Sequence, residues 1–209
     1  MSQSSNLADD LSYIRDLAEA GQNAPLLGGR FLAMWGGLVT LGYGGHFLFA
    51  TGIFDPGLGL MSYLAWWLTL IVIGAIGQWV LVSRIGDKPG QASAGNRIQG
   101  VLWTTAGIFL SVYFSALIIR MLTTGTGTEG FYWSVPMVLG LYGIGQYVTG
   151  AISGQRALKF AGIAAFAGVL AATFLTGTEY IWLVGAGSVF LAVCVPGIWM
   201  MLAEPSETV

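Results

Sequence analysis

Four polar side chains stand inside or at the edge of otherwise apolar runs in this 209-residue sequence. They are His46, Gln78, Arg120 and Gln146, and each is a candidate ligand-binding residue. Placing a polar group among apolar residues in a membrane costs free energy, which a hydrogen-bond or ion-pair partner has to offset. His46 is the only histidine and lies in the run LGYGGHFLFA. A neutral imidazole donates one hydrogen bond and accepts another, which suits a solute contact, a proton transfer or a bond between helices.

Two interpretations of the buried polar residues stay open. In the first, His46 stays neutral and bonds to a serine, a threonine or a backbone carbonyl of another helix, about 5 Å outward of the middle of its run. Gln78 and Gln146 then join helices in the same way, because an amide both donates and accepts. In the second, all three contact a bound ligand.

Arg120 lies near the end of its run, in LIIRML. A long side chain there can extend to the level of the lipid headgroups or pair with Glu129 or Glu179, which are nearby in sequence or on the same predicted side. The functional alternative is contact with an anionic solute.

The sequence offers no set of residues for catalysis or for metal binding. It has one histidine and one cysteine, Cys194, so a zinc site of His and Cys ligands cannot be assembled. The cores of the apolar runs hold no carboxylate and no lysine, and no nucleophile has a base nearby. We therefore expect no enzyme activity, no metal and no cofactor. Haem ligation by His46 with a methionine is the one alternative left open.

Composition favours the lipid bilayer as the surroundings of this chain. Hydrophobic residues make up 55% of it and charged residues 9%, too few to cover a surface that faces water. The formal net charge of -2 gives no basic surface for nucleic acid, so we expect none as a partner. The partners expected are the bilayer and either another protein or a second copy of the chain.

Six apolar runs are long enough to cross a hydrocarbon layer of about 30 Å. The sequence therefore predicts an all-α fold, an integral membrane bundle of six transmembrane helices preceded by a short cytoplasmic amphipathic helix. Residues 1–29 form that helix and an elbow, 30–203 the transmembrane domain and 204–209 a tail. The six runs are 31–53, 60–83, 98–122, 131–153, 158–176 and 180–202.

Positive charges predict the orientation, because Lys and Arg in short loops resist translocation. Seven of the eight fall before the first run, in alternate connections or, for Lys159, at the start of the run that follows one, and Arg120 is the exception. Both termini are therefore expected in the cytoplasm, with the protein in the inner (plasma) membrane. The seven are Arg15, Arg30, Arg84, Lys88, Arg97, Arg156 and Lys159; the opposite connections carry Asp55, Glu129 and Glu179.

The segment before the first run has the pattern of a short amphipathic helix. Leu7, Leu11, Ile14 and Leu17 share one face, and Gly21 is a stop signal. Helices that rest on a cytoplasmic membrane surface are usually basic, whereas this one is acidic. Its four apolar residues are therefore candidate partner-binding residues. The protein surface they cover is either the chain's own cytoplasmic loops or a separate partner.

Small residues recur at a spacing of four within several runs, which indicates close packing between helices. The patterns are Gly36/Thr40/Gly44, Gly107/Ser111/Ser115, Gly145/Thr149/Ser153 and Ala164/Gly168/Ala172. Pro196 lies deep in the sixth run and is expected to kink it near Gly197.

A short internal similarity raises the question of duplication. Residues 76–80, IGQWV, in the second run are similar to residues 144–148, IGQYV, in the fourth. One interpretation is a duplicated hairpin, with runs two and three matching runs four and five, as in transporters built from repeats. Chance similarity between glycine-rich apolar segments is the other.

The stretch DLSYIRDLAEAGQNAPLLGGRF, residues 10–31, followed by glycine-rich runs, resembles a group of uncharacterised bacterial inner-membrane proteins. They have about this length and begin with a similar acidic helix and an Ala-Pro-Leu-Leu-Gly-Gly elbow. The resemblance implies a bacterial inner membrane. It brings no activity, ligand or catalytic residue.

Two functional hypotheses follow. The first is a multi-pass inner-membrane protein that acts as a scaffold or regulatory partner through protein contacts, without catalysis. The alternative is a small carrier or binding protein for an apolar or weakly polar solute or a lipid. The carrier requires an internal cavity around His46, Gln78, Gln146 and the Pro196 kink.

Overall fold

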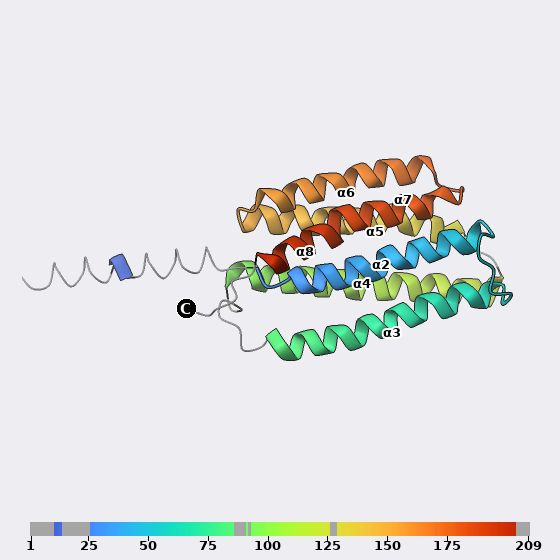
Figure 1. The fold of residues 1–209 in the computed structure, drawn as a ribbon, viewed down its shortest axis with the longest axis horizontal. Helices are drawn as coiled ribbons and strands as arrows, with labels where there is room; N and C mark the ends of the chain where they lie inside the picture. The colour runs from blue at the N-terminus through green and yellow to red at the C-terminus, as the bar shows by residue number, and fades with distance from the viewer. Residues whose placement is uncertain (1–10, 14–25, 86–90, 92, 126–128, 204–209) are drawn as a thin grey trace, which may run out of the picture.

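The computed structural model describes residues 11–13, 26–85, 91, 93–125 and 129–203, and this part of the chain is an elongated bundle of helices (Figure 1). Neighbouring helices run antiparallel along the long axis, joined by short connections. The elements are α2 (Gly29–Ala50), α3 (Leu60–Ile85), α4 (Ala94–Thr124), α5 (Glu129–Ile152), α6 (Arg156–Phe174), α7 (Tyr180–Val189), the π-helix η1 (Phe190–Cys194) and α8 (Val195–Leu202).

Five helices are long and apolar enough to cross a membrane, which indicates a multi-pass membrane protein. They are α3, α4, α5, α6 and the continuous segment Tyr180–Leu202. The predicted all-helical fold is thus confirmed, and five of the six predicted runs have the required length and composition. The remaining run is α2, whose 22 residues are diluted by several glycines and by His46. The predicted amphipathic helix lies mostly outside the described residues.

The bundle has a packed centre and two loosely attached helices. α5 pairs extensively with α6, and α2 lies between α3 and the final helix formed by α7, η1 and α8. Among the described helices, the α3 backbone approaches only α2, and the α4 backbone approaches only α5. Of the apolar stretch of α5, 56% is buried inside the bundle, against 0% of the stretch in α4. The two peripheral helices therefore leave most of their surface for lipid or for another protein.

The final helix approaches α2 closely at several glycines, among them Gly36 and Gly197. A Cβ on Gly36 would lie 2.7 Å from the backbone nitrogen of Cys194, and a Cβ on Gly197 would collide with the backbone nitrogen of Ala33. The Cys194 Sγ lies 3.7 Å from the Ala33 carbonyl oxygen between them. Lipid provides little force to bring helices together, so backbone contact and dispersion have to hold this pair.

The irregularity expected at Pro196 takes the form of a π-helical turn. Residues Phe190–Cys194 form η1, and Pro196 follows at the start of α8. Proline lacks the N–H that would bond to the carbonyl four residues before it, and π turns are a common way for a helix to absorb such a defect. The distortion therefore precedes Pro196 rather than following it at Gly197.

The small-residue pattern of α4 does not pack against another helix of the chain. Nothing lies within 4 Å of a Cβ built on Gly107, and Ser111 and Ser115 are exposed. The expectation of a helix contact there is wrong within the described residues. The reason is that α4 turns its bulky face to the bundle, where Trp103 and Phe114 pack against the core.

Replacing Gly197 by alanine is expected to destabilise the protein by about 1 to 3 kcal/mol, because the added Cβ meets the α2 backbone, which cannot move aside alone. Gly187→Ala is the matched control, since nothing lies within 4 Å of a Cβ there. Unfolding of both variants in mixed detergent micelles measures the effect. Equal stability of the two would contradict the close approach.

Candidate functional site

His46 lies in a cluster of aromatic rings near the end of the bundle opposite Arg30. Its Nδ1 accepts a hydrogen bond of 3.1 Å from Trp67 Nε1 of α3, so the proton of the neutral ring is on Nε2. The imidazole stacks on Trp182 of α7, with ring centroids 3.7 Å apart and planes at 25°. Tyr63 packs on it with a centroid distance of 4.6 Å. The hydrogen-bond partner is a tryptophan, where a hydroxyl or a backbone carbonyl was expected.

The glycines around His46 make room for the two tryptophans of α3. A Cβ on Gly42 would lie 2.5 Å from the Trp67 ring, and one on Gly45 would lie 2.5 Å from Trp66. Trp66 Nε1 also donates to the Gly42 carbonyl at 3.1 Å. The segment Gly-Tyr-Gly-Gly-His therefore works as a pair of sockets, which hold α3 against α2 and fix the histidine ring between them.

The cluster continues to the acidic connection before α7. Tyr132 packs on Trp182 with a centroid distance of 5.4 Å, and its hydroxyl donates to Glu179 Oε1 at 3.3 Å. Trp182 Nε1 is buried and has no hydrogen-bond partner. The rings fill the space around His46, so the arrangement holds helices together and leaves no room for a solute between the stacked rings.

Gln78 and Gln146 both bond across helix interfaces, as the first of the two interpretations expects. Gln78 Oε1 accepts a hydrogen bond of 2.9 Å from Trp35 Nε1 and so joins α3 to α2. Gln146 is fully buried, and its Nε2 donates to the Ala192 carbonyl at 2.9 Å, joining α5 to η1. Neither side chain contacts His46. A ligand-binding role for either stays a prediction.

The bond from Gln146 has a specific cause in the final helix. Ala192 is the residue four positions before Pro196, so its carbonyl is the one that the missing proline N–H would have served in an α-helix. The amide of Gln146 supplies a donor from a neighbouring helix instead. Buried backbone carbonyls need such partners, above all in surroundings without water. The sequence contained this signal, because a deep proline identifies the carbonyl that needs a donor.

The other candidate residues lie apart from these polar contacts. Arg120 is exposed near the end of α4, and among the described side chains it forms no ion pair with Glu129 or Glu179. Of the four leucine and isoleucine residues proposed to bind a partner, Leu11 is helical and 62% exposed. Leu7, Ile14 and Leu17 lie outside the described residues.

Two polar residues of α4 that the sequence analysis missed anchor the elbow before α2. Asn96 Oδ1 accepts a hydrogen bond of 2.8 Å from the Leu27 backbone, and Gln99 is buried where a Cβ on Gly28 would collide with its amide. Leu26 and Leu27 are themselves buried. The elbow is thereby fixed to a helix that is distant in sequence, a contact that no local pattern indicates.

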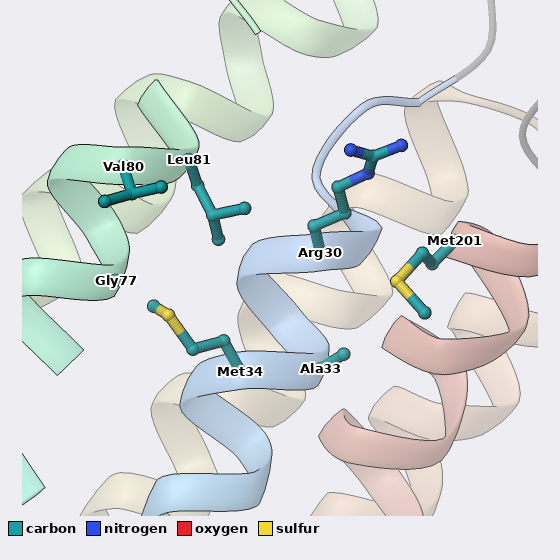
Figure 2. Close-up of a pocket in the computed structure, with 7 residues that line it drawn as sticks. All are labelled: Arg30, Ala33, Met34, Gly77, Val80, Leu81 and Met201. Carbon is teal, nitrogen blue, oxygen red and sulfur yellow. The ribbon is translucent and has the colours of Figure 1, made fainter. Parts of the chain in front are cut away.

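Two grooves open on the surface near the basic end of the bundle, the end where Arg30, Arg84, Arg97 and Arg156 lie. The first, of about 510 Å³, runs between α2, α3 and α8 (Figure 2). The second, of about 790 Å³, runs between α4 and α5. Residues lining the first include Arg30, Met34, Gly77, Val80, Leu81 and Met201; residues lining the second include Arg97, Ile98, Val101, Leu102, Ile144 and Gly145.

The described residues contain no group of three or more His, Cys, Asp or Glu side chains that could hold a metal ion. Cys194 is buried against α2. His46, Gln78 and Gln146 thus form hydrogen bonds between helices, and the two grooves are hollows on the surface of the bundle.

Replacing Gln146 by methionine is expected to destabilise the protein by about 1 to 3 kcal/mol, because a buried carbonyl loses its donor while the packed volume stays similar. The matched control is Gln91→Met, at an exposed position. Unfolding in mixed detergent micelles compares the variants. If Gln146→Met unfolds like Gln91→Met, the bond to Ala192 is not needed for stability.

Comparison with known proteins finds no family model, no curated protein and no solved structure that matches this chain.

Proposed function

We propose that this chain is a six-span protein of the bacterial inner membrane that acts as a scaffold or regulatory partner through protein contacts, without catalysis. α2 is the sixth crossing. It lies in the bundle between α3 and the final helix, so less of its surface has to be apolar. Five helices that can cross a membrane support the same setting.

The uncovered face of α4 carries this proposal. The face consists of Gly100, Thr104, Gly107, Ser111 and Ser115, all of them exposed. Nothing lies within 4 Å of a Cβ on either glycine, whereas the glycines of α2 and α3 that face each other are filled by side chains of the other helix. Small residues in a membrane let another helix approach closely. The occupant that fits this face is a transmembrane helix of a protein partner.

The internal contacts favour a scaffold over a carrier. His46, Gln78 and Gln146, which a carrier would use around an internal cavity, are each bonded to a neighbouring helix. A solute would have to break these bonds to reach the side chains. Each broken bond costs about 0.5 to 1.5 kcal/mol, which contacts with the solute would have to offset.

The charges support an orientation with both termini in the cytoplasm. Four arginines lie at the same end of the bundle. Arg30 and Arg97 are in the opening turns of α2 and α4, Arg84 is in the last turn of α3, and Arg156 is at the start of α6. Positive residues collect on the cytoplasmic side of membrane proteins. In this orientation the N-terminal segment is a cytoplasmic handle for the partner, with Leu7, Leu11, Ile14 and Leu17 as its contact residues.

The scaffold proposal predicts that a photoreactive amino acid at Ser111 captures a protein partner in intact membranes. Gly107→Leu in the same chain is expected to reduce that capture several-fold, because a bulky side chain keeps the partner helix away. The matched control is the same probe at Val72, an exposed position on α3. The mass of the captured species separates a second copy of the chain from a different protein.

Capture at Ser111 that survives Gly107→Leu, or that equals capture at Val72, would refute a docking face on α4. Deleting residues 1–22 separates the two proposed contacts. Membrane insertion and capture at Ser111 are expected to persist, whereas co-purification of a cytoplasmic partner is expected to be lost.

In the proposed orientation, reporter domains fused to the N-terminus and to the C-terminus are both expected to lie in the cytoplasm. A reporter that works only in the cytoplasm is therefore expected to be active at either end. Fusions after Gly57 and Gly177, in the opposite connections, are expected to report the other compartment. Termini that report opposite compartments would contradict six crossings, because an even number of spans returns the chain to the starting side.

A further inference from the structure

We infer that the two basic grooves each bind one anionic phospholipid, with its phosphate at Arg30 or Arg97 and an acyl chain along the apolar wall. The inference rests on the proposed membrane setting and goes beyond the scaffold role. The occupant follows from the chemistry of the lining residues and from the way the grooves repeat in the fold.

The first groove combines one cation with an otherwise apolar wall. Figure 2 shows Met34 on α2 and Leu81 on α3 extending into the space between the two helices, with Met201 on α8 at the side. Arg30 lies at the N-terminal end of α2, at the edge of this space. The groove has a volume of about 510 Å³ and is wide open, so it suits an elongated ligand that lies along the surface more than an enclosed ion. A molecule that suits it has an anionic head and a long apolar chain. Phospholipids of the surrounding bilayer have both.

The second groove lies at the equivalent place in a second hairpin. Leu102 and Gly145 line it, and their numbers exceed those of Met34 and Gly77 in the first groove by 68. Ala33 and Val101 correspond with the same offset. The shared offset favours the packed hairpin α2–α3 and its counterpart α4–α5 as the repeated unit. This pairing differs from the one considered from sequence, in which runs two and three match runs four and five, and α3 and α4 make no backbone contact.

The equivalent contacts in the two hairpins show the same helix crossing. A Cβ on Gly77 would meet the Met34 side chain, and a Cβ on Gly145 would lie 3.1 Å from Leu102. Each glycine thus lets a long side chain of the preceding helix cross over it, which leaves a hollow beside the crossing. Both hollows lie at the surface of the bundle, so in the proposed membrane setting lipid chains reach them without passing through water.

Arginine stands at the same end of both grooves. Arg30 is in the first turn of α2, and Arg97 follows the N-cap Ser93 of α4. A guanidinium stays charged and holds a phosphate through two hydrogen bonds, and basic pockets between helices on the cytoplasmic side suit anionic headgroups. Arg84 lies one turn beyond Val80 on α3 and adds a second cation near the first groove.

The test is lipid binding by the full chain in detergent, followed by native mass spectrometry after addition of phosphatidylglycerol or phosphatidylcholine. The unaltered protein is expected to retain two phosphatidylglycerol molecules and to bind phosphatidylcholine more weakly. In R30Q/R97Q the affinity for phosphatidylglycerol is expected to fall about tenfold, the effect of one lost charge-assisted hydrogen-bonded contact per site.

Two matched controls test whether lipid binding depends on the grooves, as opposed to any cation or any exposed surface of the protein. R156Q/K159Q removes two cations at the same end that line neither groove, and it is expected to bind like the unaltered protein. Val101→Trp fills the second groove and is expected to remove one of the two lipids. Ile108→Trp, equally exposed on α4 and outside the groove, is expected to remove none.

The inference fails if R30Q/R97Q binds as much phosphatidylglycerol as R156Q/K159Q, or if phosphatidylcholine binds as well as phosphatidylglycerol. Displacement of the lipid by inorganic phosphate alone would assign the arginines to a free anion and also overturn it. None of these outcomes depends on a protein partner. Failure here therefore leaves the scaffold proposal to its own crosslinking test.

Discussion

The carbonyl of Ala192 is the point on which the packing of the final helix depends. Pro196 has no N–H to donate to this carbonyl in an α-helical pattern, and a helix in lipid has little water to replace that donor. A hydrogen bond of 2.9 Å from Gln146 supplies the replacement. The bond ties α5 to the π-helical turn, and that turn presents Cys194 to Gly36 of α2. The contacts around the missing proline donor thus hold three helices together, namely the final helix, α5 and α2.

The position of α2 follows from the same contacts. Glycines let it meet the final helix on one side, and two tryptophans of α3 fill its glycine sockets on the other. A helix covered on two sides needs a smaller lipid-facing surface than an outer helix, and can hold His46 between rings. This explains how the predicted run that contains His46 can lie between two partner helices.

Hydropathy was sufficient to predict the helices, because a segment in lipid has to satisfy its backbone internally and its length is set by the bilayer. It could not predict which faces meet. The partner of His46 was missed, since nothing in the sequence shows that Trp67 of α3 faces the glycines of α2. The small-residue pattern of α4 looked like those of α2 and α6, yet it faces outward. Spacing identifies a smooth face, but only the neighbours decide what covers it.

The two glutamines show how similar sequence comes to serve different bonds. In the first hairpin Trp35 Nε1 donates to Gln78 Oε1. In the second, the equivalent atoms are Trp103 Nε1 and Gln146 Oε1, and both are buried without a hydrogen-bond partner. Gln146 instead donates its Nε2 to the carbonyl of Ala192, which Pro196 has no N–H to serve. The similar residues 76–80 and 144–148 therefore share a helix crossing and a groove. The hydrogen-bond partner of the second glutamine, Gln146, instead depends on Pro196, about fifty residues away in sequence.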